Sequence, residues 1–339
     1  WQLEYRFYSE YQAHENEFDA LKSTDIEPRV TSLCWTHHTP STQHLLSAND
    51  KSLKLWTLRD RVVRSRVQGA PGTRGEYLGE GDYALPATAP LHAMTVAQCK
   101  QSYRGAHTYH VHSVAACADR ATFISADDLS VNMWHYEHPD QSFALVNMRP
   151  AVLEEITEVA TRLTAHPDHA SLLALATSRG CIRLLDTRTR STCDGYARCF
   201  ERSEEPLHKS FFSEVVHCAS DAKFAKDGRH MVSRDYFNIY VWDLAMEHRP
   251  VATVPVHDYL RAHTCDLYEN DCLFDQFRVA VSPDGQQVVS GSYHNHFVVH
   301  NLTTGQTSSH EAGARPPRRA GKGKAGKRRA QQQVETPNI

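Results

Sequence analysis

The chain lacks any long run of apolar residues. Its 339 residues are 40% apolar and 23% charged, and no stretch approaches the roughly 18 residues that a bilayer-crossing helix requires. The first residues, WQLEYRFYSE, lack the basic region and continuous apolar core of a secretory signal peptide. We therefore expect a protein without a membrane partner.

Cysteine spacing excludes several common sites. None of the nine cysteines forms a C-x-x-C pair, and an odd number cannot all pair within one chain. We expect reduced thiols, as in a cytoplasmic protein, with the nucleus as a second compartment. The cysteines are at positions 34, 99, 117, 181, 193, 199, 218, 265 and 272.

Motifs of common catalytic sites are also missing. The sequence contains no G-x-S-x-G elbow, no H-E-x-x-H helix and no dinucleotide-binding glycine fingerprint. His107, His110 and His112 lie close together, but a zinc site needs about four ligands in a closed geometry. We interpret them as core or surface histidines. These absences disfavour an enzyme, a cofactor or a metal site, although they do not exclude a novel one.

Five segments share one pattern, which predicts a repeat architecture. Each contains an apolar strand, a Ser or Thr, a polar turn and a second, alternating strand. The segments are 45–56, 123–134, 173–186, 231–243 and 288–301. Their closing residues Trp56, Trp134, Leu185, Trp242 and His300 are 78, 51, 57 and 58 residues apart. A compact WD-type blade needs only about 40–45 residues, so insertions must lie between them.

Another strand-like run precedes each segment, at 29–35, 110–117, 161–167, 219–228 and 277–285. Several short strands per repeat, joined by Asp-Gly turns at 227–228 and 284–285, are typical of a β-propeller. We predict an all-β propeller over 1–310, with short helices between blades at 150–159 and 257–271. A basic, disordered segment is expected at 311–339, because 315–329 carries eight Arg or Lys and no acid.

Longer motifs resemble the 55-kDa regulatory B subunits of protein phosphatase 2A. They occur in that family's order: HENEFDALKSTDIEPRV (14–30), GAHTYHVHSVAACAD (105–119), SADDLSVNMWH (125–135), ITEV (156–159), SFFSEVV (210–216), WDLAMEHRPV (242–251) and YENDCLFDQF (268–277). The resemblance implies a seven-bladed WD-repeat propeller that is not an enzyme. It implies binding to a HEAT-repeat scaffold subunit and a catalytic subunit, and recruitment of phosphoproteins. Since family members extend beyond both ends, we expect a truncated chain and an incomplete ring.

The resemblance also implies a substrate groove, formed by Asp128, Ile156, Phe211, Phe212, Glu214, Tyr268 and Phe274. Without it, the pair Asp127-Asp128 is typical of a turn, and one of two adjacent Phe residues in a strand must leave the core. An acidic groove would attract basic residues that flank a phosphosite. Gln276 stands where family members usually have Lys, and Ile156 where they usually have Leu.

Residues 59–105 form the longest insertion. Their five glycines between 69 and 81 favour a flexible loop, whereas the resemblance implies a hairpin arm that binds the scaffold, without assigning individual contacts. Three functions stay open on the sequence. They are a phosphatase regulatory subunit, a WD-repeat adaptor of a ubiquitin ligase or chromatin complex, and a propeller enzyme or nucleic-acid binder that uses the basic segment. Nucleic acid is the least favoured partner.

Overall fold

The computed structural model describes residues 7–19, 23–37, 39, 42–66, 88–189, 196–202 and 212–313. The chain divides into two compact units. Unit 1 comprises Trp1–Ile156, His169–Ser171 and Thr187–Asp194, and unit 2 comprises Thr157–Asp168, Leu172–Asp186 and Gly195–Ile339. Phe211, the predicted arm tip at 67–87 and the basic stretch at 315–329 lie outside the described residues.

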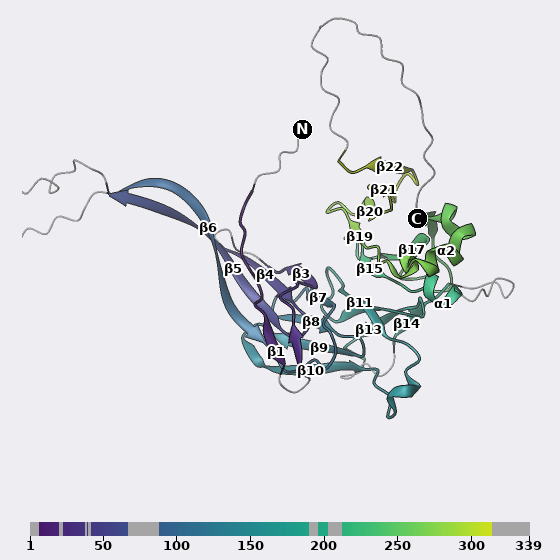
Figure 1. The fold of residues 1–339 in the computed structure, drawn as a ribbon, viewed down its shortest axis with the longest axis horizontal. Coiled ribbons are helices and arrows are strands. Elements are labelled where there is room, and N and C mark those ends of the chain that lie inside the picture. The colour runs from purple at the N-terminus through teal and green to yellow at the C-terminus, as the bar shows by residue number, and fades with distance from the viewer. Residues whose placement is uncertain are drawn as a thin grey trace, which may run out of the picture. The chain divides into compact units, whose positions relative to one another are not determined.

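Five antiparallel sheets of four strands, here called blades 1 to 5, account for most described strands (Figure 1). Blade 1 contains β3 (Ser32–Trp35), β4 (Gln43–Ala48), β5 (Leu53–Arg66) and β6 (Thr88–Tyr103), and blade 2 contains β7 (Ser113–Ala116), β8 (Thr122–Ala126), β9 (Ser130–His135) and β10 (His138–Asn147). Blade 3 contains β11 (Ala160–Ala165), β12 (Leu172–Thr177), β13 (Ile182–Asp186) and β14 (Arg198–Phe200). Blade 4 contains β15 (Asp221–Phe224), β16 (His230–Arg234), β17 (Asn238–Asp243) and β18 (Ala252–Pro255), and blade 5 contains β19 (Val279–Val281), β20 (Gln287–Gly291), β21 (His296–Asn301) and β22 (Thr307–Glu311).

Each blade is a meander, because every strand pairs with the next one in sequence. The five repeat segments supply the second and third strands of each blade, and the preceding runs supply the first, as predicted. Strands β1 (Glu17–Asp19) and β2 (Thr24–Ile26) form a separate pair. The all-β expectation is confirmed. The described residues contain five blades, two fewer than the seven that the resemblance implies.

Asp-Gly turns join the first two strands of blades 4 and 5. Gly228 has φ +65° and Gly285 has φ +72°, a left-handed conformation that costs glycine little. The Asp227 carboxylate accepts hydrogen bonds from the backbone amides of Arg229 and His230, both at 3.0 Å. The local sequence therefore determines these reversals.

Helices are few and short in the described residues. They are η1 (Leu153–Glu155), α1 (Ser213–Val216), η3 (Asp258–His263), α2 (Thr264–Glu269) and η4 (Cys272–Phe274). The helices predicted within 150–159 and 257–271 are confirmed, and both segments connect consecutive blades. None of the described helices is long and apolar enough to cross a membrane.

Aromatic rings join the two blades of unit 1. Tyr103, at the end of β6, is fully buried and lies edge-on to Phe123 and Trp134 of blade 2, with ring centroids 4.9 and 5.6 Å apart. Its hydroxyl donates to the Tyr136 carbonyl at 2.8 Å. A buried phenol usually needs such a partner. Packing and hydrogen bonding therefore fix blade 1 against blade 2.

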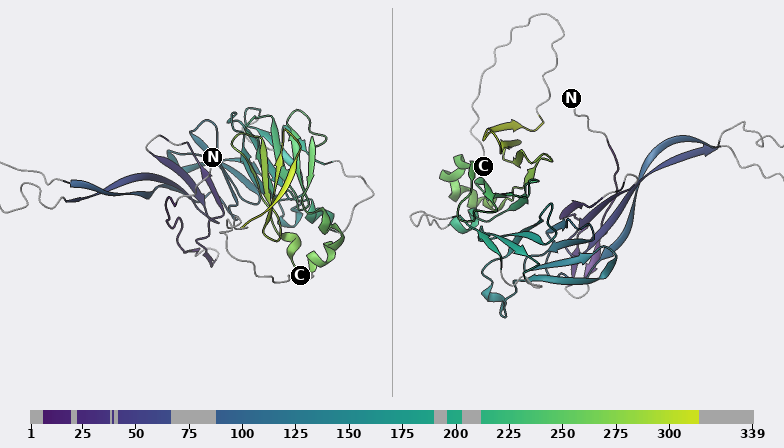
Figure 2. Two further views of the ribbon diagram at one scale, coloured as in Figure 1. Left: turned by 90° about the horizontal axis from the view of Figure 1, so that it is seen from above. Right: turned by 180° about the vertical axis from the view of Figure 1, so that it is seen from behind.

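Unit 2 buries one apolar layer between blades 3 and 4 and another between blades 4 and 5. Phe200 and Trp242 pack edge to face in the first layer, with centroids 5.9 Å apart. Val232 and Val288 belong to the second, and both are fully buried. Figure 2 shows the strands of this unit side by side. Each blade is covered by its neighbour, as a propeller sheet requires.

A hydroxyl at the start of the first strand links one blade to the next at three places. Thr31 donates to the Val111 carbonyl at 2.7 Å in unit 1, and Ser220 donates to the Phe277 carbonyl at 2.6 Å in unit 2. Thr161 makes the equivalent bond to Ala219. These bonds satisfy backbone carbonyls that would otherwise be costly to bury.

Candidate functional site

Three aromatic side chains form a row on the short helices of unit 2. Phe212 immediately precedes α1, Tyr268 lies on α2, and Phe274 ends η4. The rings of Phe212 and Tyr268 have centroids 5.1 Å apart, and those of Tyr268 and Phe274 are 5.9 Å apart. Tyr268 is 41% exposed and Phe274 is 54% exposed. We call these three residues the aromatic row.

A small core supports the aromatic row. Val216 of α1, Leu267 of α2 and Leu273 of η4 are buried together against Tyr236 and Phe237 of blade 4. Alternation along the short helices thus buries Leu267 and Leu273 and leaves the following aromatic residue outside. Figure 2 shows the helices together at one end of the unit 2 strands.

The chain reverses between α2 and η4 at Asp271, which has φ +58°. A left-handed residue after a helix is a common terminator, and Asp and Asn tolerate this conformation better than most residues. The Asn270 side chain donates to the Asp266 carbonyl at 2.7 Å, which satisfies one carbonyl of the last turn. This reversal brings Phe274 back beside Tyr268.

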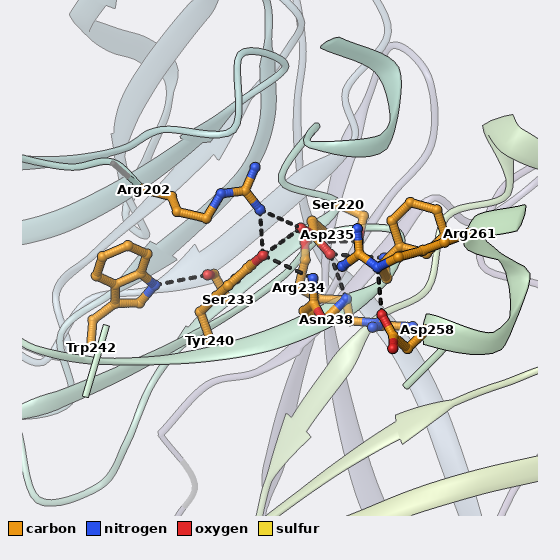
Figure 3. A network of polar contacts seen from close by, with 11 residues as sticks. Arg202, Ser220, Ser233, Arg234, Asp235, Asn238, Tyr240, Trp242, Asp258 and Arg261 are labelled. Atoms are coloured by element: carbon orange, nitrogen blue, oxygen red, sulfur yellow. Dashed lines mark hydrogen bonds and ion pairs between the residues drawn. The ribbon is translucent and has the colours of Figure 1, made fainter. Parts of the chain in front are cut away.

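Polar contacts anchor the helical segment to the blades. The Tyr293 hydroxyl, on the segment between β20 and β21, donates to the Asp275 carboxylate at 2.8 Å and lies 2.9 Å from the Tyr236 hydroxyl. The Arg261 guanidinium lies 4.5 Å from the centre of the Phe237 ring and also contacts Asp258, as Figure 3 shows for the two charged side chains. These contacts hold the helices in place, so the aromatic row is presented on a fixed support.

Acidic side chains lie close in the sequence to the residues of the aromatic row. Asp266, Glu269, Asp271 and Asp275 occur within 264–276, which contains no Lys or Arg, and all four are exposed. Glu214 on α1 is exposed as well. An apolar surface edged by carboxylates suits a peptide that carries aliphatic and basic side chains. Gln276, where family members usually have Lys, is exposed beside these acids and adds no positive charge.

Asp127 and Asp128 have different environments in unit 1. Asp127 is 1% exposed, and its carboxylate accepts the backbone amides of Leu129 and Ser130 at 2.9 and 2.6 Å. Burial opposes its ionisation, but hydrogen bonds from His107 and Leu129 lower its pKa to about 2. Asp127 is therefore the structural turn residue.

Asp128 is only half-buried, at the turn between β8 and β9. Its burial and the adjacent charge of Asp127 raise its pKa, and nearby His110 partly offsets this effect. Of the two acids, Asp128 is thus the one available to a partner.

Ile156 lies after η1 on the connection between blades 2 and 3 and is 38% exposed. Both Ile156 and Asp128 belong to unit 1, whereas the aromatic row belongs to unit 2.

Strands β5 and β6 form the predicted hairpin arm in unit 1. Their pairing runs from Leu53 opposite Tyr103 to Arg66 opposite Thr88 and continues past the length of the other blade strands (Figure 1). With 14 residues in β5, the ribbon extends about 45 Å. The flexible-loop interpretation is therefore wrong for 59–66 and 88–103, because cross-strand hydrogen bonds order this part of the insertion.

Histidine side chains stabilise blades 1 and 2. The sequence pattern did not predict these contacts. The Trp134 indole donates to the Ser125 hydroxyl at 2.8 Å, which lies 2.6 Å from His107 Nε2, and His107 Nδ1 lies 3.0 Å from Asp127. His14 and Ser47 repeat part of this arrangement in blade 1 at 2.9 Å. His107 is thus a buried core residue, and the described residues contain no His, Cys, Asp or Glu cluster suited to a metal ion.

Comparisons with known proteins agree with this fold. A family model described as "WD domain, G-beta repeat" matches residues 22–57, which span blade 1 up to β5. Over 298 residues the chain is 42% identical to the serine/threonine-protein phosphatase 2A regulatory subunit sur-6 of Caenorhabditis elegans. The chain is thus similar to a phosphatase 2A regulatory subunit over most of its own length.

The fold is an all-β WD-repeat propeller, with five blades in the described residues. The aligned part covers 87% of the chain and 60% of the sur-6 protein, so the chain spans about three fifths of that relative's length.

Proposed function

We propose that this chain is a non-catalytic regulatory subunit that recruits phosphoproteins to a serine/threonine phosphatase 2A core enzyme. The observation that carries the proposal is the aromatic row with its exposed acidic surround on unit 2. The 42% identity to a phosphatase 2A regulatory subunit supports phosphatase 2A as the enzyme that this chain serves. In this role the chain binds a substrate beside its phosphosite, and a separate catalytic subunit removes the phosphate.

The aromatic row would supply most of the contact energy. Exposed Tyr268 and Phe274 offer rigid apolar area, which is typical of interface hot spots. Carboxylates around them would attract Lys and Arg near a phosphoserine or phosphothreonine and would repel the phosphate itself. This arrangement favours binding of the basic flank and leaves the phosphate free for the catalytic subunit.

The proposed groove also includes Asp128, Ile156, Glu214 and Phe211. In unit 1, Asp128 offers a half-buried carboxylate and Ile156 an exposed apolar side chain, and the resemblance assigns both to the groove. Phe211 lies outside the described residues, and its assignment rests on the resemblance. A carboxylate that is partly shielded from water interacts more strongly with a bound cation than a fully exposed one.

The hairpin arm is the proposed contact with the HEAT-repeat scaffold subunit. A two-stranded ribbon that extends beyond its own blade offers both of its faces to a partner. Described side chains along it include exposed Val62 and Met94, at 54% and 47%. We also propose that the complete protein closes a seven-bladed ring and works in the cytoplasm and nucleus, in keeping with the family resemblance.

Affinity purification tests partner identity. The tagged chain, expressed in cells, is recovered and its partners are identified by mass spectrometry. Phosphatase scaffold and catalytic subunits are the expected partners. Recovery of ubiquitin-ligase or chromatin subunits in their place would contradict the proposal and favour the WD-repeat adaptor.

Variants of exposed residues test the binding surface. Phe274→Ala should weaken binding of a basic phosphopeptide about tenfold or more, since a hot-spot aromatic contributes roughly 2 kcal/mol. The matched control is Phe143→Ala on β10, which removes a Phe ring of similar exposure, 44% against 54%. Asp128→Lys should weaken the same peptide more strongly at low salt than at high salt, with Glu137→Lys as the control. Unchanged peptide affinity in both test variants would refute the groove assignment.

A further inference from the structure

Two cysteine thiols meet in blade 3, away from the aromatic row. Cys181 directly precedes β13, and Cys199 is the middle residue of β14. Their Sγ atoms are 3.1 Å apart, and the Cys199 thiol donates to Cys181. A disulfide bond is about 2.05 Å long, so the two sulfurs need to approach by only about 1 Å. The pairing of β13 with β14 fixes this proximity.

The surroundings distinguish the two thiols. The hydrogen bond from Cys199 lowers the pKa of Cys181, outweighing its burial, and Thr177 and Arg183 act in the same direction. The same contact, burial and the Glu201 charge raise the pKa of Cys199. Cys181 therefore loses its proton first and carries more thiolate at neutral pH than an ordinary cysteine.

A small molecule can reach this pair. A surface cavity of about 200 Å³ is lined by both cysteines together with Arg183, Glu158 and Tyr196. Arg183 is held in this cavity by an ion pair with Glu158 and lies 5.3 Å from the centre of the Tyr196 ring. A second cavity, of about 330 Å³, borders Cys199 from another side. Cys181 itself is 7% exposed, so a compact reagent is favoured over a bulky one.

We infer that Cys181 and Cys199 form a reversible oxidation site for a small peroxide. The Cys181 thiolate attacks one oxygen of hydrogen peroxide, which breaks the O–O bond and, with one proton, yields a sulfenic acid and water. The Cys199 thiolate then attacks the sulfenic sulfur and displaces hydroxide, which takes up the Cys199 proton and leaves as water. Two thiols are oxidised to one disulfide while one peroxide is reduced to two waters, and a dithiol reductant restores both thiols.

The position of the pair gives the modification a structural effect. β14 is the outer strand of blade 3 and has only three residues. Its Phe200 packs on Trp242 of blade 4, and Arg202, which follows it, contacts Asp235 and Tyr240 (Figure 3). A disulfide would bind this short strand covalently to β13. It would thereby stabilise the outer edge of blade 3, where Phe200 packs on Trp242.

Peptide mapping tests the inference directly and does not depend on the proposed function. The intact chain is treated with a few equivalents of hydrogen peroxide, free thiols are alkylated, and trypsin is added. Cleavage after Arg179, Arg183, Arg198 and Arg202 places Cys181 in GCIR and Cys199 in CFER, and a further cleavage after Arg190 places Cys193 in a third peptide, STCDGYAR. A GCIR–CFER disulfide should be the main oxidised product and should disappear on reduction.

Kinetics and variants complete the test. Cys181 should be oxidised faster than the exposed Cys265 at neutral pH, and its rate should rise with pH as the thiol loses its proton. Cys199→Ser should abolish the linked peptide and leave a sulfenic acid that dimedone traps at Cys181, whereas Cys265→Ser should leave the link intact. Faster oxidation of Cys265 in the unmodified chain, or linkage of Cys181 mainly to Cys193, would overturn the inference.

Discussion

Replacing Ser125 with alanine removes the centre of a buried polar network in blade 2. Because the Asp127 carboxylate can only accept, we assign the His107 proton to Nδ1, and Nε2 then accepts from the Ser125 hydroxyl. The same hydroxyl accepts from the Trp134 indole at 2.8 Å. His107 and Trp134 side chains are both about 2% exposed. Alanine would therefore leave the buried Trp134 indole without this acceptor, and His107 Nε2 with the Asn132 amide at 3.5 Å as a weak partner.

The expected cost follows from counting those groups. Each unsatisfied buried group costs about 1–3 kcal/mol, so Ser125→Ala should lower the free energy of unfolding by about 2–5 kcal/mol. Ser233, in blade 4, accepts only the Trp242 indole, at 2.9 Å. Its alanine variant should lose about half as much, roughly 1–3 kcal/mol. Exposed Ser142 on β10 should tolerate alanine within about 0.5 kcal/mol.

Native-state hydrogen exchange followed by mass spectrometry measures each unit separately. Ser125→Ala should increase exchange of β8 and β9 amides, and Ser233→Ala should increase exchange of β16 and β17 amides to a smaller degree. Urea denaturation of the whole chain provides the corresponding free energies. The reasoning is refuted if Ser125→Ala behaves like Ser142→Ala, or if Ser233→Ala is the more damaging change.

Three other perturbations test buried features. Burial and the Arg234 charge lower the pKa of His257 to about 4. The unfolded chain binds that proton near pH 6.5, so the free energy of unfolding should fall by up to about 3 kcal/mol as the pH drops from 6.5 to 4. The urea midpoint should fall less steeply with decreasing pH in His257→Gln. Asp221→Ala removes the acceptor of the Val279 amide and the charge facing Arg162, and a loss of about 3 kcal/mol or more in urea unfolding is expected. Gly180→Ala would place Cβ 2.3 Å from the His217 carbonyl oxygen, whereas Gly305 has nothing within 4 Å; calorimetry should show a much lower Tm for the former alone.

The sequence predicted the blades because their signals are local. Alternating strands, Asp-Gly turns and a Trp at the end of the third strand all lie within about 20 residues of one another. The segments around Trp134 and Trp242 could therefore be assigned to blades from the local pattern alone. The number of blades in a complete ring does not follow from such signals, and the described residues supply five.

The family motifs predicted the residues of the aromatic row, and the structure showed that their rings are in contact. Phe212 is 56 residues from Tyr268 in sequence, so no periodicity relates them. Their contact arises because α1 and α2 bury Val216 and Leu267 in the same small core. Tertiary packing alone could show that these rings touch while Tyr268 and Phe274 stay exposed.

Sequence by itself thus determined the all-β class, the repeat boundaries and the family resemblance of this chain. Only the tertiary structure separated buried Asp127 from half-exposed Asp128, paired His107 with Ser125, and brought Cys181 to 3.1 Å from Cys199. Strand alternation and turn chemistry act between near neighbours in the chain. Burial, pKa and long-range contacts depend on which strands pair and which blades pack, and that is decided only when the whole sheet forms.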